Sequence, residues 1–280
     1  MNEKIVVGMT EAPAAQRALD WAIDRAAKRR DRLELVAIIG GAVGVVGEGE
    51  VIDEAMRLTQ DLLERGAEAG RARGVQVDTR VGRGNPVEQL VEASQGAGML
   101  VIGSDYRGPG SGPARGPHGI RLTAAAHCPV AVVPDLDLAG RSGVIVGVDG
   151  SEVTEAAIAF AAAEADRAGE PLTAVSTWSP VAIPLGARTY PESYLENMQK
   201  LTEETLAISL AGIPQRYPDL EVRRIVESSV APDAVINRLA AHARMTVVGS
   251  HGRGRFATFL LGSTSQQVLQ RLATTTVVVR

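Results

Sequence analysis

The chain has 280 residues, of which 45% are hydrophobic and 22% charged, and its formal net charge is −4. This length favours two domains, and the composition is too apolar for intrinsic disorder. The charge divides evenly, with 16 basic and 19 acidic residues up to Ala139 and 13 and 14 after it. Neither half has the basic excess of a nucleic-acid-binding domain, so no nucleic-acid partner is expected.

Cysteine usage and hydropathy bear on the compartment. Cys128 is the single cysteine, which excludes an intrachain disulfide and fits a reducing environment. We interpret it as a small buried residue before a strand rather than as a reactive thiol. The first eight residues lack the apolar core of a signal peptide, and no stretch reaches the roughly 18 apolar residues of a membrane helix. A cytoplasmic protein without a membrane partner is expected.

The chain contains one pattern of strands and helices twice. Each copy begins with a short apolar strand ending in glycine, at residues 4–8 and 143–147, followed by apolar residues at helical spacing. Later strands are predicted in matching pairs: 33–39 and 172–178, 75–81 and 220–226, 99–103 and 245–249, 130–133 and 276–279. Helices that begin with proline are predicted at 86–93 and 232–240.

This alternation predicts two α/β domains, residues 1–139 and 140–280, with residues 134–143 as the linker. Each domain should hold a five-stranded parallel sheet with helices on both faces, joined by right-handed crossovers. Gly8 and Gly103 are 95 positions apart, whereas Gly147 and Gly249 are 102 apart. The second copy therefore has seven extra residues, which we expect in the loop after its second strand.

The second copy carries a glycine-rich segment between a strand and a helix. The apolar strand at 245–248 is followed by Gly249, Gly252 and Gly254, which can adopt positive φ and bring backbone N–H groups close to a ligand. Nine residues then separate Gly252 from Gly262, and apolar residues at helical spacing place a helix start near Ser263.

The start of that helix is a candidate anion site. Its first N–H groups lack partners within the helix and lie at the positive end of its dipole, and hydroxyls surround them at Ser263, Thr264 and Ser265. Alternatively, Ser263 and Gln266 form an S-x-x-Q capping box, which needs no ligand. The glycines upstream favour phosphate binding, because a helix cap does not require them.

The pattern Gly249-x-x-Gly252, nine residues, Gly262-Ser263 resembles the nucleotide motif of the universal stress protein family. It is neither a P-loop, because no G-x-x-x-x-G-K-[ST] occurs, nor the dinucleotide fingerprint, whose glycine spacing differs. The resemblance covers nearly the whole chain. It implies two tandem Rossmann-like (adenine nucleotide alpha hydrolase-like) domains with strand order 3-2-1-4-5, and ATP with Mg²⁺ as the ligand.

The resemblance also implies the binding residues. Gly147 would be among the nucleotide-binding residues and Asp149, two residues later, would contact the adenosine, although Asp149 or Ser151 could instead cap the following helix. Thr177 would form part of the adenine pocket wall. Val230 stands where the family often has the glycine of Gly-x-Pro, which puts that part of the wall in doubt. The phosphates would lie against a set from the glycine segment: Gly249, Ser250, Gly252, Arg253, Gly254, Gly262, Ser263, Thr264 and Ser265.

The first copy has lost the corresponding residues. Thr10 stands opposite Asp149, Tyr106 replaces the second motif glycine, and Pro117 replaces Ser263 and removes an N–H donor. Residues 108–117 have the composition of a mobile loop. One nucleotide site per chain is therefore expected, in the second half.

The sequence contains no pattern that indicates efficient catalysis. The P-loop lysine, the G-x-S-x-G motif and metal-ligand spacing among the histidines are all missing. Arg253, Arg255 and His251 could screen phosphate charge or simply be solvated. We therefore expect an ATP-binding, nucleotide-dependent regulatory or stress-response protein without catalytic or metal-ligating residues. The alternatives are a slow ATPase or phosphotransferase using the same pocket, and a scaffold that binds no nucleotide.

Assembly gives a first testable prediction. Single-domain members of the resembled family dimerise, so the two halves are expected to pack as a pseudo-twofold pair through the edge strands at 130–133 and 276–279. Whole chains are then expected to pair as a homodimer of tandem chains, and the protein partner downstream is unknown. Small-angle scattering should give the profile of one compact body per chain. Independently tumbling halves would show that the prediction is wrong.

Overall fold

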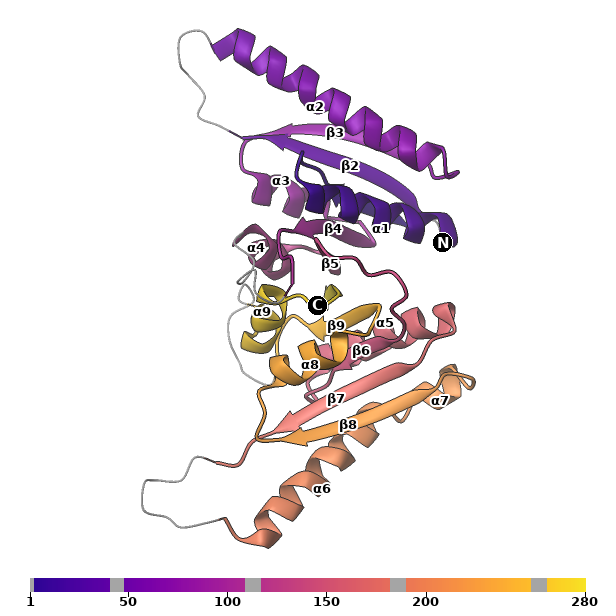
Figure 1. The fold of residues 1–280 in the computed structure, drawn as a ribbon, viewed down its shortest axis with the longest axis vertical. Coiled ribbons are helices and arrows are strands. Elements are labelled where there is room, and N and C mark those ends of the chain that lie inside the picture. Colours follow the sequence, from indigo (N-terminus) through magenta and orange to yellow (C-terminus); the bar gives the residue numbers. More distant parts are fainter. Residues whose placement is uncertain (1–2, 41–47, 109–116, 182–189, 253–260) are drawn as a thin grey trace. The chain divides into compact units, whose positions relative to one another are not determined.

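The computed structural model describes residues 3–40, 48–108, 117–181, 190–252 and 261–280 (Figure 1). The chain divides between Leu136 and Asp137 into two compact units. Each unit is described by itself.

The first unit is a parallel sheet of five strands in the order β3-β2-β1-β4-β5. Helices alternate with these strands along the chain. Its elements are β1 (Lys4–Gly8), α1 (Pro13–Arg29), β2 (Arg32–Ile39), α2 (Glu48–Arg71), β3 (Val77–Arg83), α3 (Pro86–Ala93), β4 (Met99–Ser104), α4 (Pro117–Ala125) and β5 (Val130–Pro134).

The second unit repeats this topology in the order β8-β7-β6-β9-β10. Its elements are β6 (Val144–Gly147), α5 (Glu152–Ala168), β7 (Leu172–Trp178), α6 (Glu192–Ser209), α7 (Ile213–Arg216), β8 (Val222–Ser228), α8 (Pro232–Ala240), β9 (Met245–Gly249), α9 (Ser263–Gln270) and β10 (Thr275–Val279). Both units confirm the predicted α/β fold class and the strand order 3-2-1-4-5.

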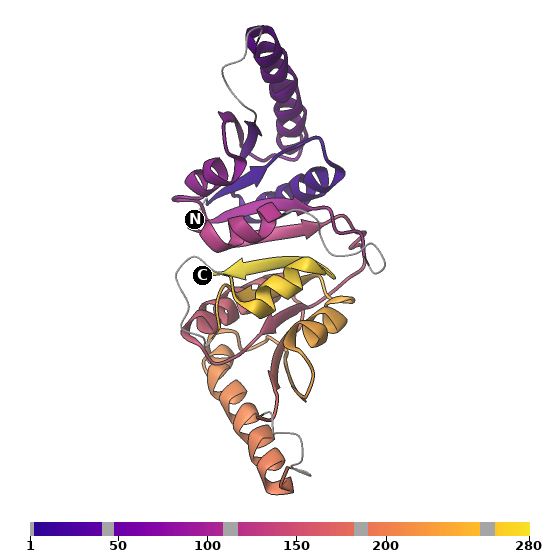
Figure 2. The same cartoon turned by 90° about the vertical axis from the view of Figure 1, so that its left-hand side faces the viewer.

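Helices cover both faces of each sheet, as Figures 1 and 2 show. In the second unit, α5 packs on β6, β9 and β10 and α6 packs on β7 and β8, while α8 and α9 contact each other on the opposite face. The central strands are therefore covered on both sides, and Met245, Val247 and Val248 of β9 are all buried. Their apolar, β-branched sequence is the one that such strands require.

The third strand of each unit begins two residues later than predicted. Pairing of β3 starts with Val77 opposite Leu33, because Gly74 has a φ of +75° and the N–H of Val75 donates to the carbonyl of Gly70. In the second unit, a turn bond from the N–H of Leu220 to Tyr217 likewise delays β8. The local apolar pattern could not distinguish these turns from the strand that follows them.

The seven extra residues of the second copy do not all lie in one loop. From the end of the second strand to the start of the third, Ile39 to Val77 is 38 positions and Trp178 to Val222 is 44, a difference of six. The seventh residue follows the third strand. Ser229 has a φ of +59° and donates its N–H to Trp178, as Gly84, with a φ of +102°, donates to Ile39. Ser229 therefore occupies the glycine position, and Val230 is the additional residue.

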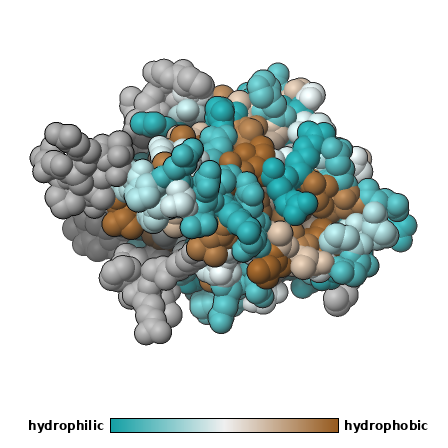
Figure 3. Space-filling model, turned by 90° about the horizontal axis from the view of Figure 1, so that it is seen from below, coloured by the Kyte–Doolittle hydropathy of each residue, from teal (hydrophilic) through white to brown (hydrophobic). Residues whose placement is uncertain are grey.

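The surface of the second unit is mixed in character. Figure 3 views the molecule from the end that carries α6, where hydrophilic residues are interspersed with hydrophobic ones. The exposed apolar side chains of this helix include Leu201 and Ile208. Across the described ranges, no helix has both the length and the apolar character needed to span a membrane.

Cys128 is buried, as predicted. Burial raises the pKa of its thiol to about 11, so the thiol stays protonated at neutral pH. A protonated, inaccessible thiol is a poor nucleophile, which supports the interpretation of Cys128 as a packing residue.

A stability prediction follows from the ends of two equivalent helices. Arg30 at the end of α1 has a φ of +60°, where the second unit has Gly169 at +63°. A side chain in this left-handed conformation is strained, so Arg30→Gly is expected to stabilise the protein by about 1 kcal/mol. Gly169→Ala should destabilise it by a similar amount. Thermal unfolding of the two variants tests both signs, and a lower midpoint for Arg30→Gly would contradict the prediction.

Candidate functional site

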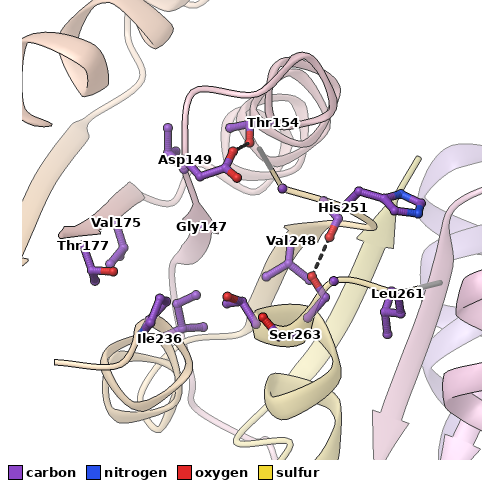
Figure 4. A pocket seen from close by; sticks show the side chains of 17 residues that line it. Gly147, Asp149, Thr154, Val175, Thr177, Ile236, Val248, His251, Leu261 and Ser263 are labelled. Carbon is purple, nitrogen blue, oxygen red and sulfur yellow. Dashed lines mark hydrogen bonds between the residues drawn. The ribbon is translucent and has the colours of Figure 1, made fainter. Parts of the chain in front are cut away.

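A cavity of about 620 Å³ opens in the second unit at the carboxyl ends of β6 and β9 (Figure 4). The chain leaves β6 towards β7 on one side, while β9 lies on the other, so the cavity is at the point where the strand order reverses. Ligands of open α/β sheets bind at this point. The lining residues are Gly147, Val148, Asp149, Thr154, Val175, Thr177, Pro232, Ile236, Val248, Gly249, His251, Gly252, Leu261, Gly262, Ser263, Thr264 and Ser265.

One wall of the cavity is apolar. Val175 and Val248 come from β7 and β9, Val148 directly follows β6, and Ile236 comes from α8. Thr177 lies beside them near the end of β7. A Cβ on Gly147 would come within 3.1 Å of the Ile236 side chain, so glycine lets the strand end pack closely there. An apolar wall with a few polar groups suits a flat organic ring.

Hydrogen bonds from the turn that follows it hold the Asp149 side chain in place. Its Oδ1 accepts a hydrogen bond from the hydroxyl of Thr154 at 2.5 Å (Figure 4). The same oxygen also accepts from the backbone N–H of Ser151 at 3.0 Å. Asp149 therefore supports the turn into α5, but the predicted helix cap is not formed, because the N-cap residue of α5 is Ser151 and it makes no side-chain capping bond among the described residues. Asp149 also lines the cavity, so this local role and a ligand contact are compatible.

The second carboxylate oxygen of Asp149 lies against the glycine segment. A Cβ on Gly252 would be only 2.6 Å from Asp149 Oδ2. Neither Gly249 nor Gly252 has a positive φ, so the predicted conformational reason for these glycines is wrong. Close approach is the reason instead: Gly252 makes room for the carboxylate, and a Cβ on Gly249 would be 3.0 Å from Val153.

The start of α9 has no side-chain cap in the described part of the chain. Gly262 is the N-cap residue and Ser263 is the first residue inside the helix, with no side-chain capping bond. The N–H of Gln266 donates to Gly262 at 2.9 Å. The capping box of Ser263 and Gln266 is therefore not formed, and the first N–H groups of the helix lie at the cavity lined by Ser263 and Thr264.

Two of the predicted phosphate residues have internal partners. Ser250 is buried and is not among the lining residues; its N–H donates to Val279 at 2.7 Å and its Oγ lies 2.9 Å from His251 Nδ1. Ser265 lines the cavity, but its hydroxyl donates to the carbonyl of Gly249 at 2.6 Å. These serines hold the strand end and the helix start together.

The remaining predicted residues fall between β9 and α9. Arg253 and Gly254, together with Arg255, lie outside the described residues. His251 lines the cavity, and its ring points away from Asp149 (Figure 4). Within the described ranges, no group of three or more histidine, cysteine, aspartate or glutamate side chains is arranged to hold a metal ion.

The equivalent position in the first unit has a different chemistry. Thr10, opposite Asp149, is exposed, and its hydroxyl accepts from the N–H of Ala12 at 3.3 Å. Tyr106, opposite Gly252, is buried. The Asp135 carboxylate, directly after β5, accepts from Arg17 at 2.6 Å and from Arg107 at 3.2 Å. Arg107, which follows Tyr106 in the loop after β4, therefore pairs with a carboxylate of the first unit itself. Residues 109–116 lie outside the described part.

The sequence is similar to known proteins over its whole length. The model of the universal stress protein family matches residues 1–134 and again 142–280. This chain belongs to the universal stress protein family. Two universal stress proteins of Mycobacterium tuberculosis are 33% and 32% identical to it, and each alignment covers 99% of this chain and 96% of the relative.

Solved structures agree with this assignment at the level of the fold. A universal stress protein from Archaeoglobus fulgidus superposes with a TM-score of 0.70 at 21% identity, covering 99% of this chain and 98% of that chain. The two matches of the family model confirm the resemblance inferred from the glycine motif, and they confirm the tandem arrangement.

The contact between Gly252 and Asp149 gives a prediction about the folded state. Gly252→Ala must displace a carboxylate that accepts two hydrogen bonds, so it is expected to destabilise the second unit by about 1–2 kcal/mol. A Cβ on Gly262 would meet its neighbours at 3.5 Å or more, so Gly262→Ala should be nearly neutral. Thermal unfolding of the two variants measures the difference. Equal midpoints would contradict the tight contact.

Proposed function

We propose that this universal stress protein binds ATP, together with Mg²⁺, in its second unit and acts as a nucleotide-dependent regulatory or stress-response protein without efficient catalysis. The observation that carries the proposal is the cavity itself. It joins an apolar wall, a positioned carboxylate and a helix start without a side-chain cap among the described residues. The apolar wall suits a base, the carboxylate can accept a hydrogen bond from a ribose hydroxyl, and the helix start can donate to a phosphate chain.

The nucleoside would lie at the β6 and β7 end of the cavity. Val148, Val175 and Ile236 offer an apolar surface for the base, with Thr177 at its edge. The Asp149 carboxylate can accept a hydrogen bond from a ribose hydroxyl or an amino group.

The phosphates would lie at the α9 end. The first N–H groups of α9 and the hydroxyls of Ser263 and Thr264 can donate to them, and the helix dipole favours the negative charge. Arg253 and Gly254 belong to the segment between Gly252 and the helix, and we assign them to the same phosphate end. Mg²⁺ would be held mainly by the phosphate oxygens and water, as is usual for this ion.

The proposed role is regulatory because the described lining supplies groups that bind and orient. Ligand binding stabilises the conformation that binds it, and this is sufficient for a switch. Cys128 is the single cysteine, so the chain forms no intrachain disulfide, which supports placing the protein in the reducing environment of the cytoplasm. A slow ATPase would differ by sustained, many-turnover hydrolysis of labelled ATP that is lost when the glycine segment is changed.

Binding is tested first on the purified protein. Denaturation should release adenine nucleotide into the supernatant, or the nucleotide-free protein should bind ATP with Mg²⁺ at one site per chain in calorimetric titration. Absence of any adenine-nucleotide binding would leave the scaffold hypothesis.

The site is tested by Gly262→Asp. Gly262 is the N-cap of α9 and has room for a side chain, so the variant should fold normally. Its carboxylate would cap the first N–H groups of the helix and repel phosphate, so ATP affinity should fall by roughly 100-fold or more.

The matched control is Gly116→Asp in the first copy, at a residue outside the described part of the chain. It should change ATP affinity little, because the first copy lacks the carboxylate and the second motif glycine. Two sites of equal affinity, or loss of binding only in the control variant, would assign the pocket to the other half.

A further inference from the structure

Thr154 is a buried polar residue in the first turn of α5 that the glycine motif does not include. Its side chain is 3% exposed, and it lines the cavity beside Asp149. Its hydroxyl lies 2.5 Å from Asp149 Oδ1 and 3.0 Å from the hydroxyl of Ser151. A threonine in the first turn of a helix could also cap that helix, but here its hydroxyl donates to a carboxylate.

The direction of these hydrogen bonds is determined by the carboxylate. An ionised carboxylate only accepts, so the Thr154 hydroxyl donates its hydrogen to Asp149. Its oxygen can then accept from the Ser151 hydroxyl, while the Ser151 backbone N–H donates to the same Asp149 oxygen at 3.0 Å. Two donors thus fix Oδ1, and one of them is itself held in place.

Fixing one oxygen determines where the other lies. With Oδ1 held by Thr154 and Ser151, Oδ2 is directed to the glycine segment, where it leaves no room for a Cβ on Gly252. Asp149 thereby contacts both ends of the cavity, the strand end near the proposed nucleoside position and the segment that leads to the phosphate position. Rotation of its side chain would move the proposed nucleoside contact and the glycine segment together.

The first unit offers an internal comparison. At the four positions that correspond to Asp149, Ser151, Thr154 and Gly252, it has Thr10, Ala12, Ala15 and Tyr106. Ala15 is buried, as Thr154 is, so this position requires a small buried side chain but does not require a hydroxyl to form the helix. The hydroxyl is present only in the copy that has the carboxylate.

We propose that Thr154 is a positioning residue of the nucleotide site, which holds the Asp149 carboxylate in the orientation that binds the nucleoside. This inference rests on the proposed function and adds to it a residue that acts through Asp149. Thr154 need not touch the nucleotide.

The test is calorimetric titration of the full chain with ATP and Mg²⁺. Thr154→Val keeps the shape and removes the hydroxyl, and it should weaken binding roughly tenfold, the factor for one hydrogen bond to a charged group. Thr154→Ser retains the donor and should stay within about threefold of the parent chain. Thr123→Val, which removes a buried hydroxyl from α4 of the first unit, is the control for a general effect on folding and should leave the affinity unchanged.

A double-mutant cycle separates positioning from direct contact. In the Asp149→Ala background, Thr154→Val should cause less than a twofold further loss, because the group it positions is already gone. Equal affinity of the valine and parent chains, equal losses in the valine and serine variants, or a full tenfold loss in the Asp149→Ala background would each overturn the role of Thr154. If the parent chain binds no adenine nucleotide, the proposed function itself fails and this inference fails with it.

Discussion

The close approach of the Asp149 carboxylate to the backbone of Gly252 is the constraint on which the candidate site depends. It requires a glycine in the loop after β9, a turn after β6 that presents the carboxylate, and a first turn of α5 that supplies donors for it. The turn after β6 and the first turn of α5 follow each other in the sequence, whereas the loop after β9 is far from both. They meet because parallel strands bring their carboxyl ends to the same edge of the sheet.

The start of α9 forms another part of the cavity wall. The N–H of Gly262 donates to the carbonyl of Ser250, and Ser265 returns a hydrogen bond to Gly249. The helix start is therefore attached to the end of β9 by backbone and serine contacts, and these contacts leave the first turn of the helix facing the cavity. Binding of an anion would then need no rearrangement of the strand end beneath it.

The fold was predictable from the sequence because its central strands are buried on both faces. Runs rich in β-branched residues occur where the sheet has no solvent side, as in β9 (Met-Thr-Val-Val-Gly) and β10 (Thr-Thr-Val-Val-Val). The starts of the edge strands β3 and β8 were predicted two residues early, because each preceding turn contains an apolar residue, Val75 or Leu220. Prediction also failed for Ser229, because only backbone geometry reveals that this serine, and not Val230, takes the glycine conformation.

The site was predictable only in part. The glycine spacing located the segment from Gly249 to Ser265, and the aspartate after Gly147 was placed correctly beside it. The reason for Gly249 and Gly252 could not be predicted, since their close packing against Val153 and Asp149 is a contact between segments far apart in the sequence. Thr154 was missed because its hydrogen bond depends on the turn into α5. A threonine five residues after an aspartate at a strand end is the signal that could have found it.

The mutual dependence of Asp149, Thr154 and Gly252 has an evolutionary consequence for a duplicated chain. Once one copy loses the carboxylate, selection no longer maintains the hydroxyl that oriented it or the glycine that made room for it. Residues such as Ala15 and Tyr106 of the first copy, which can neither orient nor accommodate a carboxylate, are then tolerated at the equivalent positions. An aspartate introduced at Thr10 alone would find Ala15 where the second copy has the threonine donor and the buried Tyr106 where it has the glycine, so one substitution would not recreate the arrangement of the second copy. Loss of the arrangement around Asp149 in one half is therefore difficult to reverse by single substitutions.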